Sequence, residues 1–228
     1  GTGGGALISR LLGEHREEEA ERVSVFTICL AVFTAAVFSV GIGIFMNPLL
    51  KLLGAGENTY EYAGQYAFCV IVLGGIPTVL SNVLSNLIRS IGCSKVAGKG
   101  IILGGLLNIA LDPLFMFVLL PDGCEVLGAG IATCLSNCFA CLFFIIVMAR
   151  MKGQSVLTFD LRKGRPDKES IESIFAVGIP SAAASFLFDL DYVVIDKLMV
   201  SYHDLALAAI GIVLKVERFP LNVGIGIC

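Results

Sequence analysis

The chain has 228 residues, of which 56% are hydrophobic and only 15% are charged, and its formal net charge is −3. Soluble domains usually carry about 25% charged residues. A soluble chain this apolar would expose large hydrophobic patches and aggregate, so the composition excludes an ordinary soluble domain. The small net charge indicates no particular partner.

The longest uncharged segments have the length of membrane-spanning helices. Val23 to Met46 and Val126 to Ala149 contain no charged residue, and about 20 apolar residues in a helix cross a bilayer core. In lipid only a helix or a closed barrel satisfies its own backbone, and the alternation of barrel strands is missing. The sequence therefore predicts an all-α, polytopic transmembrane helix bundle, with spans at 23–46, 62–88, 96–120, 126–149, 171–200 and 205–228.

Both ends of the chain resemble cut ends. The first residue is Gly1 rather than Met, Gly1 to Leu12 has the pattern of the end of a helix, and Cys228 lies inside an apolar run. We expect the intact protein to be longer in both directions.

Lysine and arginine alternate between the predicted loops. Twelve of the sixteen basic residues fall on one side of the membrane, and the positive-inside rule makes that side cytoplasmic. The polar segment 152–170, with its glycines and proline, lies on the same side and is predicted to be a linker. The twelve basic residues are Arg10, Arg16, Arg22, Arg89, Lys95, Lys99, Arg150, Lys152, Arg162, Lys163, Arg165 and Lys168.

Small residues recur within the predicted spans. Gly100 and Gly104 form a GxxxG pattern, which lets two helices approach closely in lipid. The run Gly3 to Gly5 fits either a close helix crossing or a mobile segment. Three cysteines at helical spacing, Cys134, Cys138 and Cys141, include a C-x-x-C, but no second ligand pair accompanies it. We therefore interpret them as packing residues rather than a metal site.

Polar residues inside the spans are the candidates for function, because each is costly to place in lipid. Asn108 and Asp112 are four residues apart and share one helix face. Pro113 follows and removes a backbone donor. This pattern is typical of a proton or cation site, and the alternative is a structural Asp-Pro turn near the helix end.

A second polar stripe lies in the span 62–88. Ser81, Asn82, Ser85 and Asn86 precede Arg89. We expect these side chains to form hydrogen bonds between helices rather than a ligand site. Pro77 in the same span predicts a kink.

Acids and one lysine also occur in the last two spans. Asp189 and Asp191 lie in 171–200, and Lys215 and Glu217 interrupt the apolar run 205–228. Such groups must pair, titrate or line a water-filled cavity, and an internal Asp189–Lys215 ion pair is the structural alternative. An unpaired acid in a low-dielectric setting takes up a proton more readily, so we hypothesise that Asp112 or Glu217 exchanges a proton for a cationic substrate.

Several short motifs resemble the bacterial branch of the multidrug and toxic compound extrusion (MATE) family of efflux transporters. Each motif is short, but their order and spacing together are specific. They are Gly3 to Gly13, Leu53-Gly54-Ala55, Arg89-x-x-Gly92-x-x-Lys95, Leu107 to Phe115, Gly128 to Thr133 and Gly178 to Ser181.

The resemblance implies twelve helices in two six-helix lobes, of which this chain would hold the second to the eighth helix. Residues 1–151 would be most of the N-terminal lobe, 152–170 the cytoplasmic linker and 171–228 the start of the C-terminal lobe. Asn108 and Asp112 would match the family's N-lobe cation site. Asp189 or Asp191 would match its C-lobe acid, and Lys215 and Glu217 a Lys-x-Glu of one branch.

The resemblance also implies what the protein does. It would be an antiporter, not an enzyme, driven by H⁺ or Na⁺ without another cofactor, and would export cationic or amphipathic drugs by alternating access. We expect a monomer in the bacterial plasma membrane, with no nucleic-acid partner. One alternative is a lipid-linked precursor flippase of related fold, although such carriers show more cationic residues in the cavity than Lys215 and Arg218. An intramembrane enzyme is the other alternative, but the sequence contains none of the motifs of such enzymes.

Overall fold

The computed structural model describes residues 1–52, 59–121, 123–151, 153, 155–160, 166–200, 211, 213 and 216. Every regular element within these residues is a helix, as the sequence predicts. In chain order they are α1 (Thr2–Gly13), α2 (Glu17–Leu52), α3 (Tyr60–Ala67), the π-helix η1 (Phe68–Leu73), α4 (Gly75–Ser90), α5 (Ser94–Leu114), the π-helix η2 (Phe115–Leu119), α6 (Glu125–Arg150) and α7 (Lys168–Val200).

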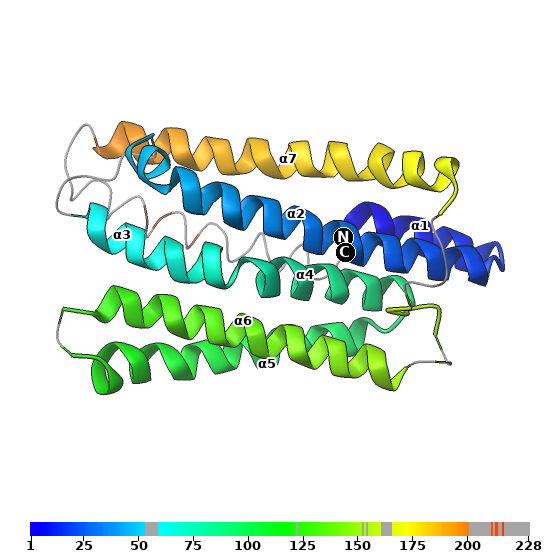
Figure 1. The fold of residues 1–228 in the computed structure, drawn as a ribbon, viewed down its shortest axis with the longest axis horizontal. Coiled ribbons are helices and arrows are strands. Elements are labelled where there is room, and N and C mark those ends of the chain that lie inside the picture. Colours follow the sequence, from blue (N-terminus) through cyan, green and yellow to red (C-terminus); the bar gives the residue numbers. More distant parts are fainter. Residues whose placement is uncertain are drawn as a thin grey trace.

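The long helices lie roughly parallel to one another and alternate in direction (Figure 1). Among the described residues, 4 helices are long and apolar enough to cross a membrane, and the bent pair Tyr60–Leu73 and Gly75–Ser90 makes up to 5. These helices confirm the first five predicted spans. The sixth, 205–228, lies outside the described residues.

The second predicted span is broken rather than straight. Tyr60–Leu73 and Gly75–Ser90 meet at an angle of 53°, and Gly74 stands between them. The kink predicted from Pro77 therefore lies three residues earlier. Pro77 occupies the first turn of α4, where its missing N–H removes no intrahelical bond.

Two further prolines disturb their helices. Phe45 in α2 has non-helical backbone angles, because the ring of Pro48 crowds the carbonyl of Ile44. In α5, Pro113 lies at the end of the α-helix, and the chain continues as the π-helix η2. The continuation agrees with the apolar run that follows Pro113 in the sequence. The break at Phe45 was not predicted.

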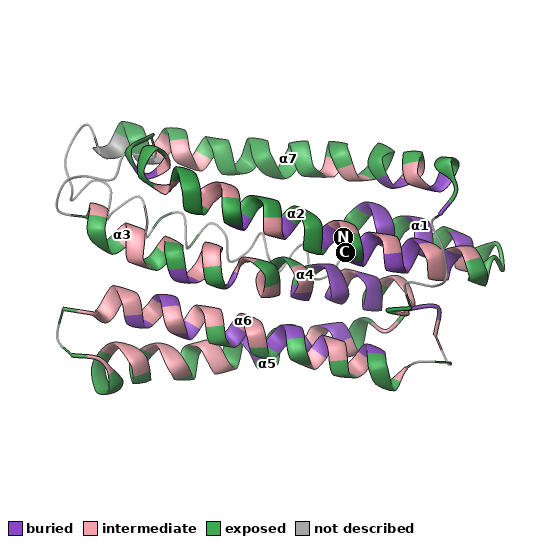
Figure 2. Cartoon of the chain, viewed as in Figure 1, coloured by how far each residue is buried: buried purple, intermediate pink, exposed green. Residues whose placement is uncertain are grey.

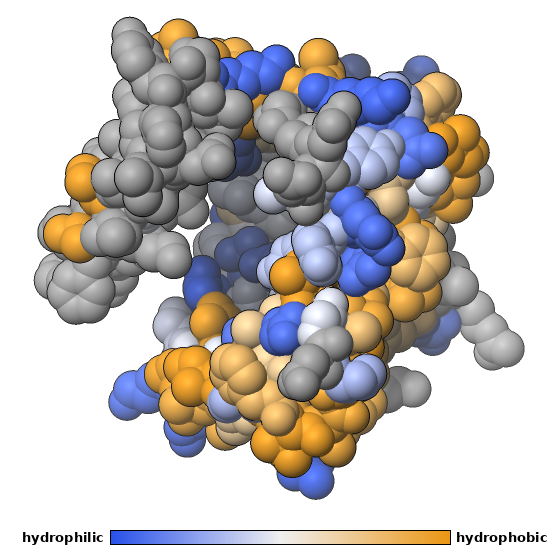
Figure 3. All heavy atoms as spheres, turned by 90° about the vertical axis from the view of Figure 1, so that its left-hand side faces the viewer, coloured by the Kyte–Doolittle hydropathy of each residue, from blue (hydrophilic) through white to orange (hydrophobic). Residues whose placement is uncertain are grey.

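The best-buried side chains gather toward the end of the bundle at which α1 finishes and α2 begins (Figure 2). Leu11, Leu84, Leu87, Phe144 and Met148 are each no more than 1% exposed. Most side chains of α5 and α7 are instead exposed or half-buried. Seen from the opposite end, hydrophobic side chains cover the lower and right-hand flanks (Figure 3). An apolar outer surface of this kind matches a lipid environment.

The glycine run at the start of α1 forms a close helix crossing. A Cβ on Gly3 would overlap the carbonyl oxygen of Ile174 on α7, and one on Gly4 would overlap the side chain of Thr27 on α2. Of the two interpretations left open by the sequence, the structure supports the crossing. Within the described residues, α1 is also the main contact of α7.

The predicted linker is partly packed into the bundle. Val156 and Leu157 are buried, and Leu157 belongs to the same hydrophobic core as Leu11 and Met148. The Ser155 hydroxyl accepts a hydrogen bond from the Leu157 amide at 3.2 Å, which turns the chain inward. The start of the linker is therefore anchored to the helices rather than free.

The crossing at Gly3 predicts a specific destabilisation. Gly3→Ala would force α1 and α7 apart, and we expect a loss of about 1–3 kcal/mol, seen as a lower thermal midpoint of the detergent-purified protein. Gly178→Ala is the matched control, because a Cβ there meets no atom within 4 Å. Equal midpoints for the two variants would contradict the close crossing.

The buried linker leucine predicts a second effect. Leu157→Ala should lower stability by about 2–5 kcal/mol, because it leaves a cavity in the core. Phe159→Ala, two residues on, removes a side chain that is 40% exposed and should have little effect. Thermal unfolding of both purified variants provides the comparison, and a larger loss for Phe159→Ala would refute the anchoring.

Candidate functional site

Asn108 and Asp112 lie on one face of α5, one helical turn apart. The Asn108 side-chain nitrogen donates a hydrogen bond to Oδ1 of Asp112 at 3.1 Å. Both side chains are half-buried. Pro113 has no N–H, so it cannot bond the carbonyl of Ile109 in the same turn. Within residues 108–113, the helix thus offers a carboxylate, an amide and a carbonyl that lacks its usual backbone donor.

A third side chain reaches this pair from α6. The same Asn108 nitrogen lies 3.4 Å from Oγ1 of Thr133. Helices α5 and α6 approach closely here. A Cβ placed on Gly104 would lie only 3.1 Å from the Cβ of Ala140. The close approach confirms what the GxxxG pattern predicts. Thr133 was not singled out as a site residue in the sequence analysis, because the contact spans two helices.

Another hydrogen bond joins α6 to α4. The Asn137 side-chain nitrogen donates to Oγ1 of Thr78 at 2.8 Å, and both residues are half-buried. Asn137 lies four residues after Thr133 and therefore on the same face of α6. This pair was not predicted from the sequence either, although an asparagine in an otherwise apolar span is a signal that could have identified it.

The polar stripe of α4 behaves differently from the prediction. Ser81 and Asn82 both bond to the carbonyl of Thr78, and Ser85 bonds to that of Asn82. The prediction of bonds between helices is therefore wrong for these three residues. Their side chains are short enough to reach carbonyls of their own helix, which satisfies them locally.

The acids of the last spans are not brought to the Asn108–Asp112 pair by any described contact. Asp189 and Asp191 lie in the second half of α7, and both are exposed. Lys215 and Glu217 lie outside the described residues, as does any Asp189–Lys215 ion pair. These four candidates remain predictions.

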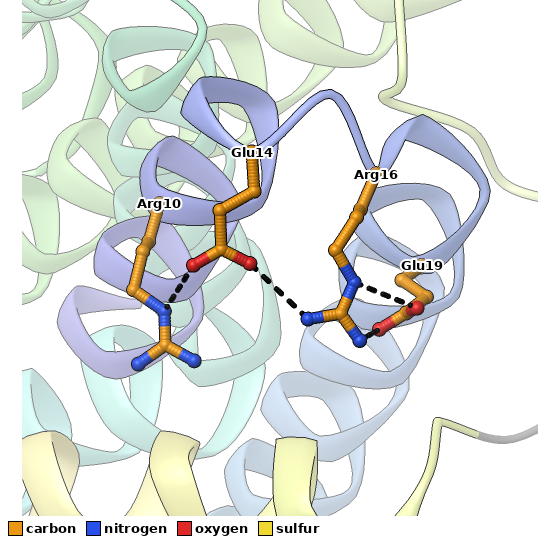
Figure 4. A network of polar contacts seen from close by, with 4 residues as sticks. All are labelled: Arg10, Glu14, Arg16 and Glu19. Carbon is orange, nitrogen blue, oxygen red and sulfur yellow. Dashed lines mark hydrogen bonds and ion pairs between the residues drawn. The ribbon is translucent and has the colours of Figure 1, made fainter.

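A network of charged side chains lies at the turn between α1 and α2 (Figure 4). Glu14 pairs with Arg10 at 3.3 Å and with Arg16 at 3.1 Å, and Arg16 also pairs with Glu19 at 2.7 Å. The hydrogen bonds that Arg16 donates to Glu19 and then to Glu14 raise the pKa of Arg16 above its usual value. Arg10, Glu14 and Arg16 are exposed and Glu19 is half-buried, so the network stabilises a surface turn and contributes little to overall stability.

Comparisons with known proteins show the family to which the chain belongs. The MatE family model matches residues 1–114, the first half of the chain. The multidrug export protein MepA of Staphylococcus aureus is 31% identical over 228 residues, and its homologue from Staphylococcus saprophyticus is also 31% identical. In both cases the match covers all of this chain but 49% of the relative, so the chain spans about half the length of these proteins.

Solved structures show the same fold. An inward-facing multidrug resistance MATE family transporter of the MOP superfamily is 29% identical with a TM-score of 0.72, and the match covers 79% of this chain and 40% of that one. A MOP superfamily transporter from Pyrococcus furiosus is 25% identical with a TM-score of 0.82, and the match covers 95% of this chain and 47% of that one. The family match, the relatives and the fold agree, and the chain belongs to the MatE family of multidrug efflux transporters.

Proposed function

We propose that the full-length protein is a cation-coupled antiporter that exports cationic or amphipathic compounds by alternating access. The observation that carries this proposal is the hydrogen-bonded group of Asn108, Asp112 and Thr133 inside an otherwise apolar pair of helices. An ionisable side chain within an apolar span is costly to place there, and such residues usually mark a functional site. The relatives that match the whole chain are multidrug export proteins.

The three side chains suit a small hard cation or a proton. Carboxylate, amide and hydroxyl oxygens are the ligands that hard cations prefer. In the structure Asn108 turns its nitrogen toward Asp112 and Thr133. An amide donates hydrogen bonds through its nitrogen and accepts them through its oxygen. Rotation of the Asn108 amide by half a turn would therefore turn its oxygen toward either a bound Na⁺ or a protonated Asp112.

Amide rotation gives the site two alternative states. With no cation, the Asn108 amide hydrogens partner the charge of Asp112. When a cation or proton arrives, the amide oxygen and the carboxylate both face it. Since a ligand shifts an equilibrium only by its difference in affinity for the two states, this reorientation is a physical means by which cation binding favours one conformation of the lobe.

The C-terminal candidates complete the proposal. Asp189, Asp191, Lys215 and Glu217 would contribute to substrate binding or coupling in the second lobe, and the protein would lie in the bacterial plasma membrane as a monomer with the linker 152–170 cytoplasmic. A lipid-linked precursor flippase is less well supported, because the curated relatives that match the whole chain are named as drug exporters.

The coupling proposal predicts a loss of active export in two variants. In cells that lack other exporters, expression of the full-length gene should lower ethidium accumulation. An uncoupler or removal of Na⁺ should stop export and return the accumulation to its original level. Asp112→Asn should abolish export, because the amide brings no negative charge to the cation and does not take up a proton near neutral pH. Asn108→Ala should slow it about tenfold, since it removes a hydrogen bond to a charged group.

Asp167→Asn is the matched control for these variants. Asp167 is an exposed acid just before α7 and away from the described hydrogen bonds of the site, so its amide variant should export ethidium at the wild-type rate. Full activity of Asp112→Asn at wild-type protein levels, or export that ignores both the uncoupler and Na⁺, would refute the proposal.

A further inference from the structure

Thr78 on α4 and Asn137 on α6 form a hydrogen bond. Within the described residues, it is the only bond between side chains of these two helices. The Asn137 nitrogen donates to the Thr78 hydroxyl oxygen at 2.8 Å, a short bond between residues 59 positions apart in the chain. Between membrane helices apolar burial gives little drive for association, so a bond of this kind helps set how the helices meet.

On the α6 side, this bond lies one turn from the candidate cation site. Thr133 and Asn137 share a face of α6, and Oγ1 of Thr133 lies 3.4 Å from the Asn108 nitrogen. That distance is near the upper limit for a hydrogen bond. A small rotation or shift of α6 would therefore remove Thr133 from the site.

On the α4 side, the bond lies at the bend of the broken span. The Thr78 hydroxyl donates to the carbonyl of Gly74 at 2.7 Å, and the Thr78 backbone amide bonds to the same carbonyl at 3.0 Å. Gly74 separates the two halves that meet at 53°. A Cβ on Gly74 would lie 3.3 Å from the sulfur of Cys134, so α6 also packs against the bend itself.

We propose that Thr78 and Asn137 are positioning residues for the cation site. Their hydrogen bond holds α6 against the bend at Gly74 in the register that brings Thr133 to Asn108. This inference rests on the proposed cation coupling and adds residues that do not touch the cation. A hydrogen bond that only stabilises the bundle would change the amount or stability of the protein, whereas a positioning bond also sets the affinity for the cation.

The test measures ethidium transport by the full-length protein in proteoliposomes, titrated with Na⁺ at fixed pH and with protons at fixed Na⁺. Thr78→Val keeps the shape of the side chain and removes the oxygen that accepts from Asn137. We expect it to raise the half-saturating concentration of the coupling cation about fivefold, the size of one lost hydrogen bond. The ethidium concentration at half-maximal rate should stay the same.

Asn137→Ala should give a shift of similar size, and the double variant should add little to either, because both changes remove the same bond. Thr78→Ser keeps the hydroxyl and should restore wild-type cation dependence. Thr34→Val is the matched control. The Thr34 hydroxyl likewise bonds to the carbonyl four residues earlier, that of Leu30, but no described residue of another helix bonds to it.

The outcomes separate this inference from the proposed function. If the wild type responds to the cation but Thr78→Val does not shift its half-saturation, the positioning role is wrong and the proposed function stands. A shift of the same size in Thr34→Val would also overturn the positioning role. If the wild type responds to neither Na⁺ nor protons, the positioning role and the proposed function are both wrong. Should Asn137→Ala fail to reach the membrane, the comparison of Thr78→Val with Thr78→Ser still decides.

Discussion

Close approach of helix backbones around α6 is the constraint on which the rest of this structure depends. A Cβ on Gly128 would lie 2.8 Å from the carbonyl oxygen of Phe115 in η2, and one on Gly130 would lie 3.0 Å from the Cβ of Cys69 in η1. Because dispersion contacts and hydrogen bonds drive helix association in lipid, backbones must meet at small residues. Helix α6 therefore packs against both π-helical segments and against α4 and α5.

The same constraint determines where polar groups can meet. Side chains as short as threonine and asparagine form hydrogen bonds across a helix pair only where the backbones are close. The tight contact of α5 with α6 at Gly104 lets Asn108 reach Thr133, and the contact of α6 with α4 lets Asn137 reach Thr78. The candidate cation site and the hydrogen bond proposed to position it thus share one packing arrangement.

Two breaks in the helices lie close to the polar side chains of the candidate site. Gly74 ends η1 at the bend, and Pro113 lies beside Asp112 at the transition from α5 to η2. Local departures from α-helix release backbone carbonyls, which membrane proteins tolerate where protein or water satisfies them. Both π-helical segments contact α6, while part of each is exposed on the outer surface, as at Leu73 and Phe117.

The first five helical spans and the Asn108–Asp112 pair could be predicted from the sequence alone. Uncharged length and four-residue spacing are local properties, and in lipid the backbone has few alternatives to a helix. Which helices are neighbours could not be predicted and is seen only in the folded structure. The fold shows that Thr133 approaches the pair, that Asn137 bonds to Thr78, that the serines of α4 bond within their own helix and that Leu157 is buried. Each of these contacts depends on the distance between separate segments, which no spacing along one helix specifies.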